Sequence, residues 1–421
     1  MTARSTGQGW VLDIALAEDG FNALHPAGKG YMEQLGHDHT DFDKVFAQVQ
    51  SGAMLLKAWA TVAAEAEERA TDHEAEGFAQ TAADFYLRAA VMWGRAQYSI
   101  HDAEDVRKTA FRDRCNHCVE RLGELRGNRV RRVVLDFEGK HLYALLHLPA
   151  GEVRNAPAVV LGPGMDMIKE DYIHAAERYF TSRGMVALSV EGPGQGETRA
   201  KGLTVDLTNY ERAVSRCIDH LAELPEVDAG RIGMFAISMS GYWGMRTVAT
   251  DPRLGALAGF GAVSGDFETI FDRAQPSFKN DYMYMSGYTD EDRFTAELAQ
   301  HLPLGDLVTE ITCPLLLGIG EMDELTRLEQ ALATYERIRA PKEMRVYEGE
   351  FHPLGGVAAE TFRYGAEWIE RALAGELGTP GRDERYYVHS DGRTTKGCAN
   401  PPWWLGAVPH EITDAAAMAP S

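Results

Sequence analysis

Short apolar runs that alternate with longer helical patterns constrain the fold of this chain more than any other feature. The runs are nearly unbroken and lie at Ala158–Leu161, Val186–Val190, Ile232–Ile237, Ala256–Ala262, Leu315–Ile319 and Met344–Tyr347. Such runs are typical of parallel strands that are buried on both faces. The stretches between them are long enough for crossover helices. The alternation predicts an α/β fold with a doubly wound, mostly parallel sheet.

The regions that flank this alternation have different patterns. Phe42, Val45, Phe46 and Val49 have the spacing of one apolar helical face, and residues 78–93 repeat that texture. Near residue 130 the pattern changes to two predicted strands, at 133–137 and 142–148. The chain of 421 residues is longer than a single small core requires. We therefore expect a helical N-terminal cap region at 1–128, a catalytic domain at 129–377 and a C-terminal extension at 378–421.

One segment inside the expected catalytic domain is longer than a simple connection. The aromatic side chains of residues 267–311 include Phe271, Phe278, Tyr282, Tyr284 and Tyr288. A long insertion between two late strands often forms a lid or a pocket wall. The alternative is a helical excursion with a small core of its own.

Composition and charge exclude several classes of partner. The net charge of -21 argues against nucleic acid and against an anionic membrane surface. No apolar run approaches the roughly 20 residues that span a bilayer, and the first residues have no secretory signal pattern. Five cysteines, an odd number, indicate free thiols in a reducing compartment, so we expect a cytoplasmic protein. We also expect that the protein uses no cofactor.

The strongest catalytic motif is Ala236-Ile237-Ser238-Met239-Ser240, which ends a predicted strand and begins a helical pattern. A serine at such a sharp strand-to-helix turn is the nucleophile of α/β-hydrolases, whose usual pattern is G-x-S-x-G. Ala236 and Ser240 replace the two glycines but are small enough for the tight turn. The backbone N–H of Met239 would point toward the oxygen of a reacting carbonyl. The alternative role for Ser238 is a simple helix N-cap.

An acid and a base follow the serine in the order that these hydrolases use. Asp323 comes after the predicted strand at 315–319, and His352 comes after the last predicted strand. The carboxyl ends of parallel strands are where α/β sheets place their sites. Asp266 is an alternative acid. The sequence therefore predicts Ser238 as nucleophile, Asp323 as acid and His352 as base.

A second oxyanion donor is expected in the loop after the strand at 158–161, where Gly162-Pro163-Gly164-Met165-Asp166 follows. Gly164 and Met165 are both candidates, and the sequence does not separate them. Two weak metal patterns, Cys115-Asn116-His117-Cys118 and His37-Asp38-His39, lack the partners of a zinc site, so no metal is expected.

These features together resemble a known group of α/β-hydrolases. The resemblance runs from about Phe42 to Leu373 and is carried by the helical N-terminal half, the segment 164–170, the turn Glu191-Gly192-Pro193-Gly194-Gln195-Gly196-Glu197 and the Ser238 elbow. The group contains 2,6-dihydroxypseudooxynicotine hydrolase, fungal polyketide-shortening hydrolases and FrsA-like esterases. The resemblance implies an α/β-hydrolase fold, cleavage of a carbon–carbon bond next to a carbonyl, a Ser-Asp-His triad at Ser238, Asp323 and His352, and a homodimer.

The expected function is therefore that of a serine hydrolase which cleaves a carbon–carbon bond in an aromatic or polyketide-like ketone. A carboxylesterase or lactonase with the same triad is the first alternative, because the residues that replace the two elbow glycines leave the subfamily and substrate open. A non-catalytic scaffold that kept the fold is the second alternative.

Overall fold

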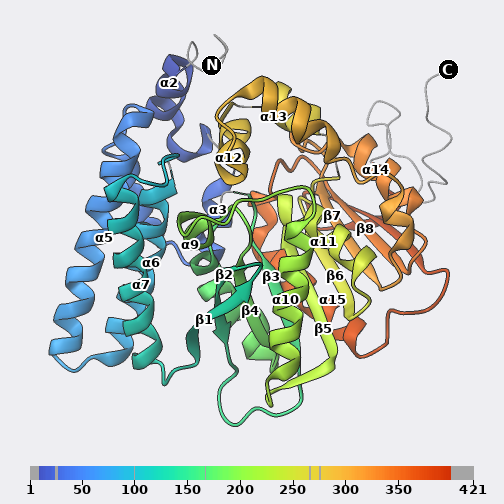
Figure 1. Ribbon diagram of the computed structural model, residues 1–421, viewed down its shortest axis with the longest axis horizontal. Coiled ribbons are helices and arrows are strands. Elements are labelled where there is room, and N and C mark those ends of the chain that lie inside the picture. The colour runs from blue at the N-terminus through green and yellow to red at the C-terminus, as the bar shows by residue number, and fades with distance from the viewer. Residues whose placement is uncertain are drawn as a thin grey trace.

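The computed structural model describes residues 9–23, 27–98, 100–165, 167–264, 267–274 and 276–399. Its centre is a ten-stranded sheet with the order β1-β2-β4-β3-β5-β6-β7-β8-β9-β10 (Figure 1). The strands are β1 Val130–Phe137, β2 Lys140–His147, β3 Ala156–Gly162, β4 Val186–Glu191, β5 Val227–Ile237, β6 Leu254–Phe260, β7 Leu315–Gly320, β8 Lys342–Tyr347, β9 Asp383–Val388 and β10 Thr394–Lys396.

Strand directions define an α/β-hydrolase fold, so the predicted fold class is confirmed. The strands from β4 to β9 in the sheet order run parallel to one another, whereas β2 pairs antiparallel with β1 and β4, and β10 pairs antiparallel with β9. Each predicted apolar run forms a strand. Two further strands, β9 and β10, come from the C-terminal extension, so the sheet continues past residue 377.

Alternation along each central strand buries both faces of the sheet. In β5, Met234 and Ala236 belong to one apolar core, and Phe235 and Ile237 belong to the other. This is the two-residue period of a strand. Helices α10 (Asn209–Glu223) and α11 (Met239–Thr250) pack on the first face, and α15 (Ala358–Leu373) packs on the second. Shorter helices complete these layers: α8 Ile173–Ala175, α9 Gly196–Ala200 and α14 Leu328–Arg337.

The N-terminal region is helical, as its pattern predicts. Its helices are α2 Gly9–Asp19, α3 Gly28–Gln34, α4 His39–Phe46, α5 Gly52–Ala75, α6 Ala79–Tyr98 and α7 Val106–Leu125. Helices α5, α6 and α7 pack side by side at one edge of the molecule (Figure 1). Their buried side chains form one continuous core with the α15 face of the sheet. None of the described helices has the length and apolar character that a membrane span requires.

The insertion at 267–311 lies above the carboxyl ends of the strands (Figure 1). It contains a π-helical turn at Thr269–Arg273, helices α12 (Pro276–Ser286) and α13 (Glu291–Glu297), and short 3-10 turns. Four of its aromatic rings contact one another in tilted or edge-to-face arrangements: Phe267, Phe271, Tyr282 and Phe294. The segment therefore has a packed aromatic core of its own, and that core is continuous with the α10–α11 side of the sheet.

Candidate active site

Ser238 stands on a strained turn between β5 and α11. Its backbone has φ 58° and ψ −125°, a conformation that a non-glycine residue rarely adopts. Surrounding hydrogen bonds hold the turn: the Ser238 N–H donates to the Phe260 carbonyl at 3.0 Å, and its carbonyl accepts from Gly241 at 2.9 Å and Val263 at 3.2 Å. The strain turns the hydroxyl away from the sheet and leaves Met239 as the first residue of α11.

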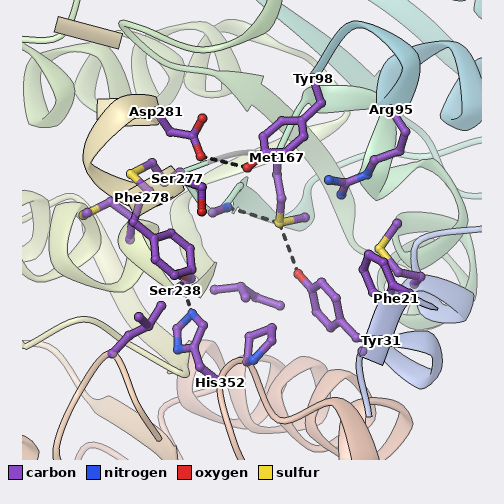
Figure 2. A pocket seen from close by; sticks show the side chains of 18 of the residues that line it. Phe21, Tyr31, Arg95, Tyr98, Met167, Ser238, Ser277, Phe278, Asp281 and His352 are labelled. Carbon is purple, nitrogen blue, oxygen red and sulfur yellow. Dashed lines mark hydrogen bonds between the residues drawn. The ribbon is translucent and has the colours of Figure 1, made fainter. Parts of the chain in front are cut away.

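The predicted base and acid lie next to this hydroxyl. The His352 Nε2 atom is 2.7 Å from the Ser238 Oγ (Figure 2). The His352 Nδ1 atom is 3.1 Å from an Asp323 oxygen. Both ionisable side chains are almost fully buried, with 3% and 0% of their surface exposed. The other Asp323 oxygen accepts from the N–H groups of Leu325 and Thr326 at 2.9 and 2.7 Å. These bonds orient the carboxylate toward the imidazole.

Neighbouring glutamates serve the loop that carries His352. The Glu324 carboxylate accepts from the His352 backbone N–H at 3.1 Å, and the Glu321 carboxylate accepts from the Gly349 N–H at 3.1 Å. Gly261, with φ +53°, lies against the imidazole, where an added Cβ would be 3.3 Å from its Cε1 atom. The alternative acid Asp266 lies outside the described residues.

The loop after β3 lies beside the predicted nucleophile. A Cβ added to Gly164 would be 3.4 Å from the Ser238 Cβ, so this backbone is close to Ser238. Gln195 holds the loop, because its amide nitrogen donates to the Gly164 carbonyl at 2.7 Å. The Gln195 oxygen accepts from the Gly192 N–H and the Tyr210 hydroxyl at 3.0 and 2.7 Å. The glycine-rich turn at 191–197 therefore supports the loop after β3, which carries the predicted oxyanion donors Gly164 and Met165.

Ser240, in place of the usual glycine, makes a contact that glycine lacks. Its hydroxyl is 2.6 Å from the Gly162 carbonyl and 2.8 Å from the Ile237 carbonyl, and it accepts from the Ile237 N–H at 2.7 Å. The single hydroxyl proton serves one carbonyl at a time. This side chain connects the end of β3 to the elbow.

A cavity of about 340 Å³ opens above the serine. The three predicted oxyanion residues Gly164, Met165 and Met239 line it together with Ser238 and His352. The cap and the insertion supply the remaining walls, which are mostly apolar or aromatic: Phe21, Tyr31, Met32, Phe46, Leu55, Trp59, Ile270 and Phe278. The volume and the lining are those of a small-molecule pocket.

One end of the cavity is polar. The Asp281 carboxylate, on α12, accepts from the Tyr98 hydroxyl at 2.8 Å and lies 2.5 Å from the His101 Nε2 atom (Figure 2). Only 5% of Asp281 is exposed. Tyr98 ends α6, so this cluster joins the insertion to the cap. No local sequence pattern predicts this cluster, because its members come from separate segments.

A buried ion cluster lies beneath the cavity. The Lys169 ammonium contacts the carboxylates of Glu170, Glu191 and Glu197 at 2.7, 3.4 and 3.4 Å, and the Arg112 guanidinium contacts Glu170 at 3.1 Å. Burial alone would lower the pKa of Lys169, but the surrounding carboxylates raise it. Burial would raise the pKa of Glu170, and the two cations lower it. The neighbouring charges thus favour the ionised forms of Lys169 and Glu170.

The weak metal patterns form no site. Cys115 and Cys118 lie inside α7, and burial raises the pKa of both thiols, which makes them poor ligands and nucleophiles. His37 is buried, and burial lowers its pKa. Across the described ranges, no group of three or more His, Cys, Asp or Glu side chains is arranged to hold a metal ion.

The fold, together with a serine elbow below a small-molecule cavity, defines the chain as an α/β-hydrolase. A family model described as Esterase FrsA-like matches residues 32–290, which is more than half of the chain. The chain belongs to the FrsA-like esterase family and is a hydrolase.

Individual relatives agree with this assignment. The 2,6-dihydropseudooxynicotine hydrolase of Paenarthrobacter nicotinovorans is 26% identical over 268 residues, which cover 63% of this chain and 70% of that protein. The α/β-hydrolase xenA of Xenoacremonium sinensis is 28% identical over 254 residues, or 58% of this chain and 59% of xenA. The chain thus spans less than two thirds of this fungal relative.

A solved structure has the same fold. The crystal structure of 2,6-dihydroxy-pseudo-oxynicotine hydrolase matches with a TM-score of 0.73 and 23% identity, over 84% of this chain and 99% of that one. The covered part of this chain is larger than the segment 129–377 alone.

Proposed function

We propose that this chain is a serine hydrolase that cleaves a carbon–carbon bond next to a carbonyl in an aromatic or polyketide-like ketone. The observation that carries the proposal is the continuous hydrogen-bonded path from Asp323 through His352 to Ser238, at 3.1 and 2.7 Å, at the floor of the cavity. Nucleophile, base and orienting acid are the three parts of a serine triad.

In the proposed mechanism, His352 removes the Ser238 proton as the oxygen attacks the substrate carbonyl. The electron pair of the C=O bond moves to the oxygen, which the N–H of Met239 and an N–H of Gly164 or Met165 stabilise. Collapse of the tetrahedral intermediate re-forms the C=O bond and breaks the adjacent carbon–carbon bond, whose electron pair leaves with the departing fragment as an enolate. His352 returns its proton to that fragment, and water then releases the acyl group from the serine.

The cavity supports the proposed substrate class. Aromatic walls and one polar end suit a flat molecule with a few oxygen substituents. One relative is named as a hydrolase of 2,6-dihydropseudooxynicotine, and the proposed substrate class follows that name. The printed description of the family, an esterase, favours the alternative that the same residues hydrolyse a carboxylic ester.

Two measurements on the full chain test this proposal. A fluorophosphonate probe should label the wild type at Ser238 and should not label Ser238→Ala. Turnover of 1-phenylbutane-1,3-dione and of phenyl acetate separates the two reaction types, and Ser238→Ala should lower either by about 10⁴-fold or more. Ser182→Ala, at an exposed position remote from the cavity, is the matched control. Full turnover by Ser238→Ala would refute the mechanism.

The division of the chain into a cap at 1–128, a catalytic domain at 129–377 and an extension is also part of this proposal. In it, the cap and the insertion form the pocket walls, and the sheet carries the triad. Five free cysteines agree with a cytoplasmic protein. The implied homodimer is a further proposal, which size-exclusion chromatography with light scattering would test.

A further inference from the structure

The sulfur of Met167 lies where two strong donors converge. The Gly164 N–H donates to the Met167 Sδ at 3.2 Å, and the Tyr31 hydroxyl donates to the same atom at 3.1 Å (Figure 2). Tyr31 and Met167 are 7% and 4% exposed. A thioether is a weak acceptor. Two buried donors are therefore paired with an acceptor that a substrate oxygen would surpass.

This point of convergence is next to the reacting serine. A Cβ added to Gly164 would be 3.3 Å from the Met167 sulfur and 3.4 Å from the Ser238 Cβ. These three residues and Tyr31 all line the cavity. The sulfur and the Ser238 side chain are therefore both in van der Waals range of one point beside the Gly164 backbone, so a single small substrate can contact both.

The donors are fixed, whereas the acceptor can move. Gln195 holds the Gly164 backbone through its carbonyl. Helix α3, which carries Tyr31, packs against the loop after His352 so closely that a Cβ on Gly30 would lie 2.8 Å from the Gly355 carbonyl oxygen. Methionine is unbranched, with three rotatable side-chain bonds, and adapts easily. The sulfur can leave without any change in the positions of its two donors.

We propose that Met167 is a place-holder and that Tyr31 is a catalytic residue contributed by the cap. Substrate displaces the thioether, and a substrate oxygen on which negative charge develops accepts from the Tyr31 hydroxyl and the Gly164 N–H. This inference rests on the proposed function and adds to it a donor outside the sheet. Tyr31 keeps its proton throughout, so the bond changes remain those of the serine mechanism.

Two substrate oxygens could take this position, and kinetics distinguishes them. One is the oxygen of the attacked carbonyl, and the other is the enolate oxygen of the departing fragment. Tyr31→Phe should lower kcat at least tenfold, since a hydrogen bond to a charged group is lost. Equal loss with phenyl acetate and 1-phenylbutane-1,3-dione identifies the attacked carbonyl. Loss with the diketone alone identifies the enolate.

A binding measurement tests the place-holder without any turnover. In the Ser238→Ala background, 4-nitrophenolate supplies an anionic oxygen, and its absorbance reports binding. Tyr31→Phe should weaken its affinity about tenfold or more. Met167→Leu should preserve or raise the affinity, because the ligand no longer competes with the sulfur. If the Met167 sulfur has only a structural role, Met167→Leu should instead weaken phenolate binding, as Tyr31→Phe does.

Tyr179→Phe is the matched control. The Tyr179 hydroxyl donates to Gln34 at the end of the same helix α3, but Tyr179 does not line the cavity. It should leave kcat and phenolate affinity within twofold of their starting values. The proposal is overturned if Tyr31→Phe changes neither quantity, or if Met167→Leu weakens the phenolate as much as Tyr31→Phe does. If Ser238 proves unreactive, the proposed function fails, while the phenolate titration still decides the role of Tyr31.

Discussion

Replacing Lys169 with methionine removes one buried cation and keeps a side chain of similar length. The wild-type ammonium lies within 3.4 Å of three carboxylates, on Glu170, Glu191 and Glu197, and none of its surface is exposed. Arg112 contacts two of these carboxylates and Arg132 contacts the third. Three cations thus face three anions, and the variant leaves one negative charge without compensation.

The expected cost follows from that imbalance. Removing one partner of a buried ion pair destabilises a protein by about 3–5 kcal/mol. Lys169 has three partners, so the upper part of this range applies. With a urea slope of roughly 3 kcal/mol per molar for a chain of this size, the urea concentration at the unfolding midpoint should fall by about 1.3–1.7 M at pH 7.

Acid should narrow the gap between the variant and the wild type. Lys169 is the charge that most lowers the pKa of Glu170, and its removal lets burial raise that pKa above the unfolded value. A carboxyl with a raised folded pKa destabilises the folded state at neutral pH, and protonation relieves this cost as the pH falls. The difference should therefore be smaller at pH 5 than at pH 7.

Urea unfolding followed by circular dichroism at both pH values provides the assay. Lys29→Met is the matched control, because Lys29 forms an exposed ion pair with Asp43 and its loss should change stability by less than about 1 kcal/mol. If Lys169→Met unfolds within 1 kcal/mol of the wild type at pH 7, or if its deficit grows on acidification, the reasoning about charge balance is wrong.

Three further changes have defined outcomes. Burial, with a contribution from Arg112, lowers the pKa of Lys108 to about 7, so the unfolded chain binds more protons between about pH 7 and 10.5. Wild-type stability should therefore rise with pH in that window, by up to roughly 1.4 kcal/mol per unit, and Lys108→Met should lack this slope in urea titrations at pH 7 and 9. Ser240→Gly removes the hydrogen bond that connects β3 to the elbow. The loss of one hydrogen bond should lower kcat about tenfold with little change in KM. An unchanged kcat would contradict a positioning role for Ser240. Asp281→Asn keeps the shape but loses the charge that joins the cap to the insertion, and should raise KM several-fold while kcat stays within twofold; steady-state kinetics with the reverse pattern would assign Asp281 to the chemistry instead.

The parts of this fold that were predictable are those with a short-range pattern. Two-sided burial made the central strands nearly continuous apolar runs, which no other arrangement explains as simply. Residues 383–388 escaped prediction because Asp383, Glu384 and Arg385 begin a strand that is only partly buried near the sheet edge. That segment has neither an unbroken apolar run nor a clean alternation.

The site residues that could be predicted are likewise those with a short-range sequence pattern. Ser238, Asp323 and His352 each follow a recognisable strand, so sheet topology brings their loops to one edge. Tyr31 and Asp281 lie on helices of the cap and of the insertion, and nothing in their local sequence separates them from ordinary core residues. The elbow pattern predicts Ser240 only as a small residue that fits the turn, whereas its hydroxyl forms hydrogen bonds with the Ile237 N–H and the Gly162 carbonyl. Such roles depend on contacts between distant segments.

The continuous core shared by the cap and the α15 face restricts how a substrate can enter. Swinging helices α5 to α7 away as one rigid body would expose much of that core to water, at about 25 cal/mol for each Å² of apolar surface. The aromatic core of the insertion belongs to the α10–α11 side of the sheet instead, and Asp281 on α12 joins the cap through polar contacts with Tyr98 and His101. Separating α12 from α6 breaks these polar contacts and not a shared apolar core, so we expect ligands to exchange along that seam.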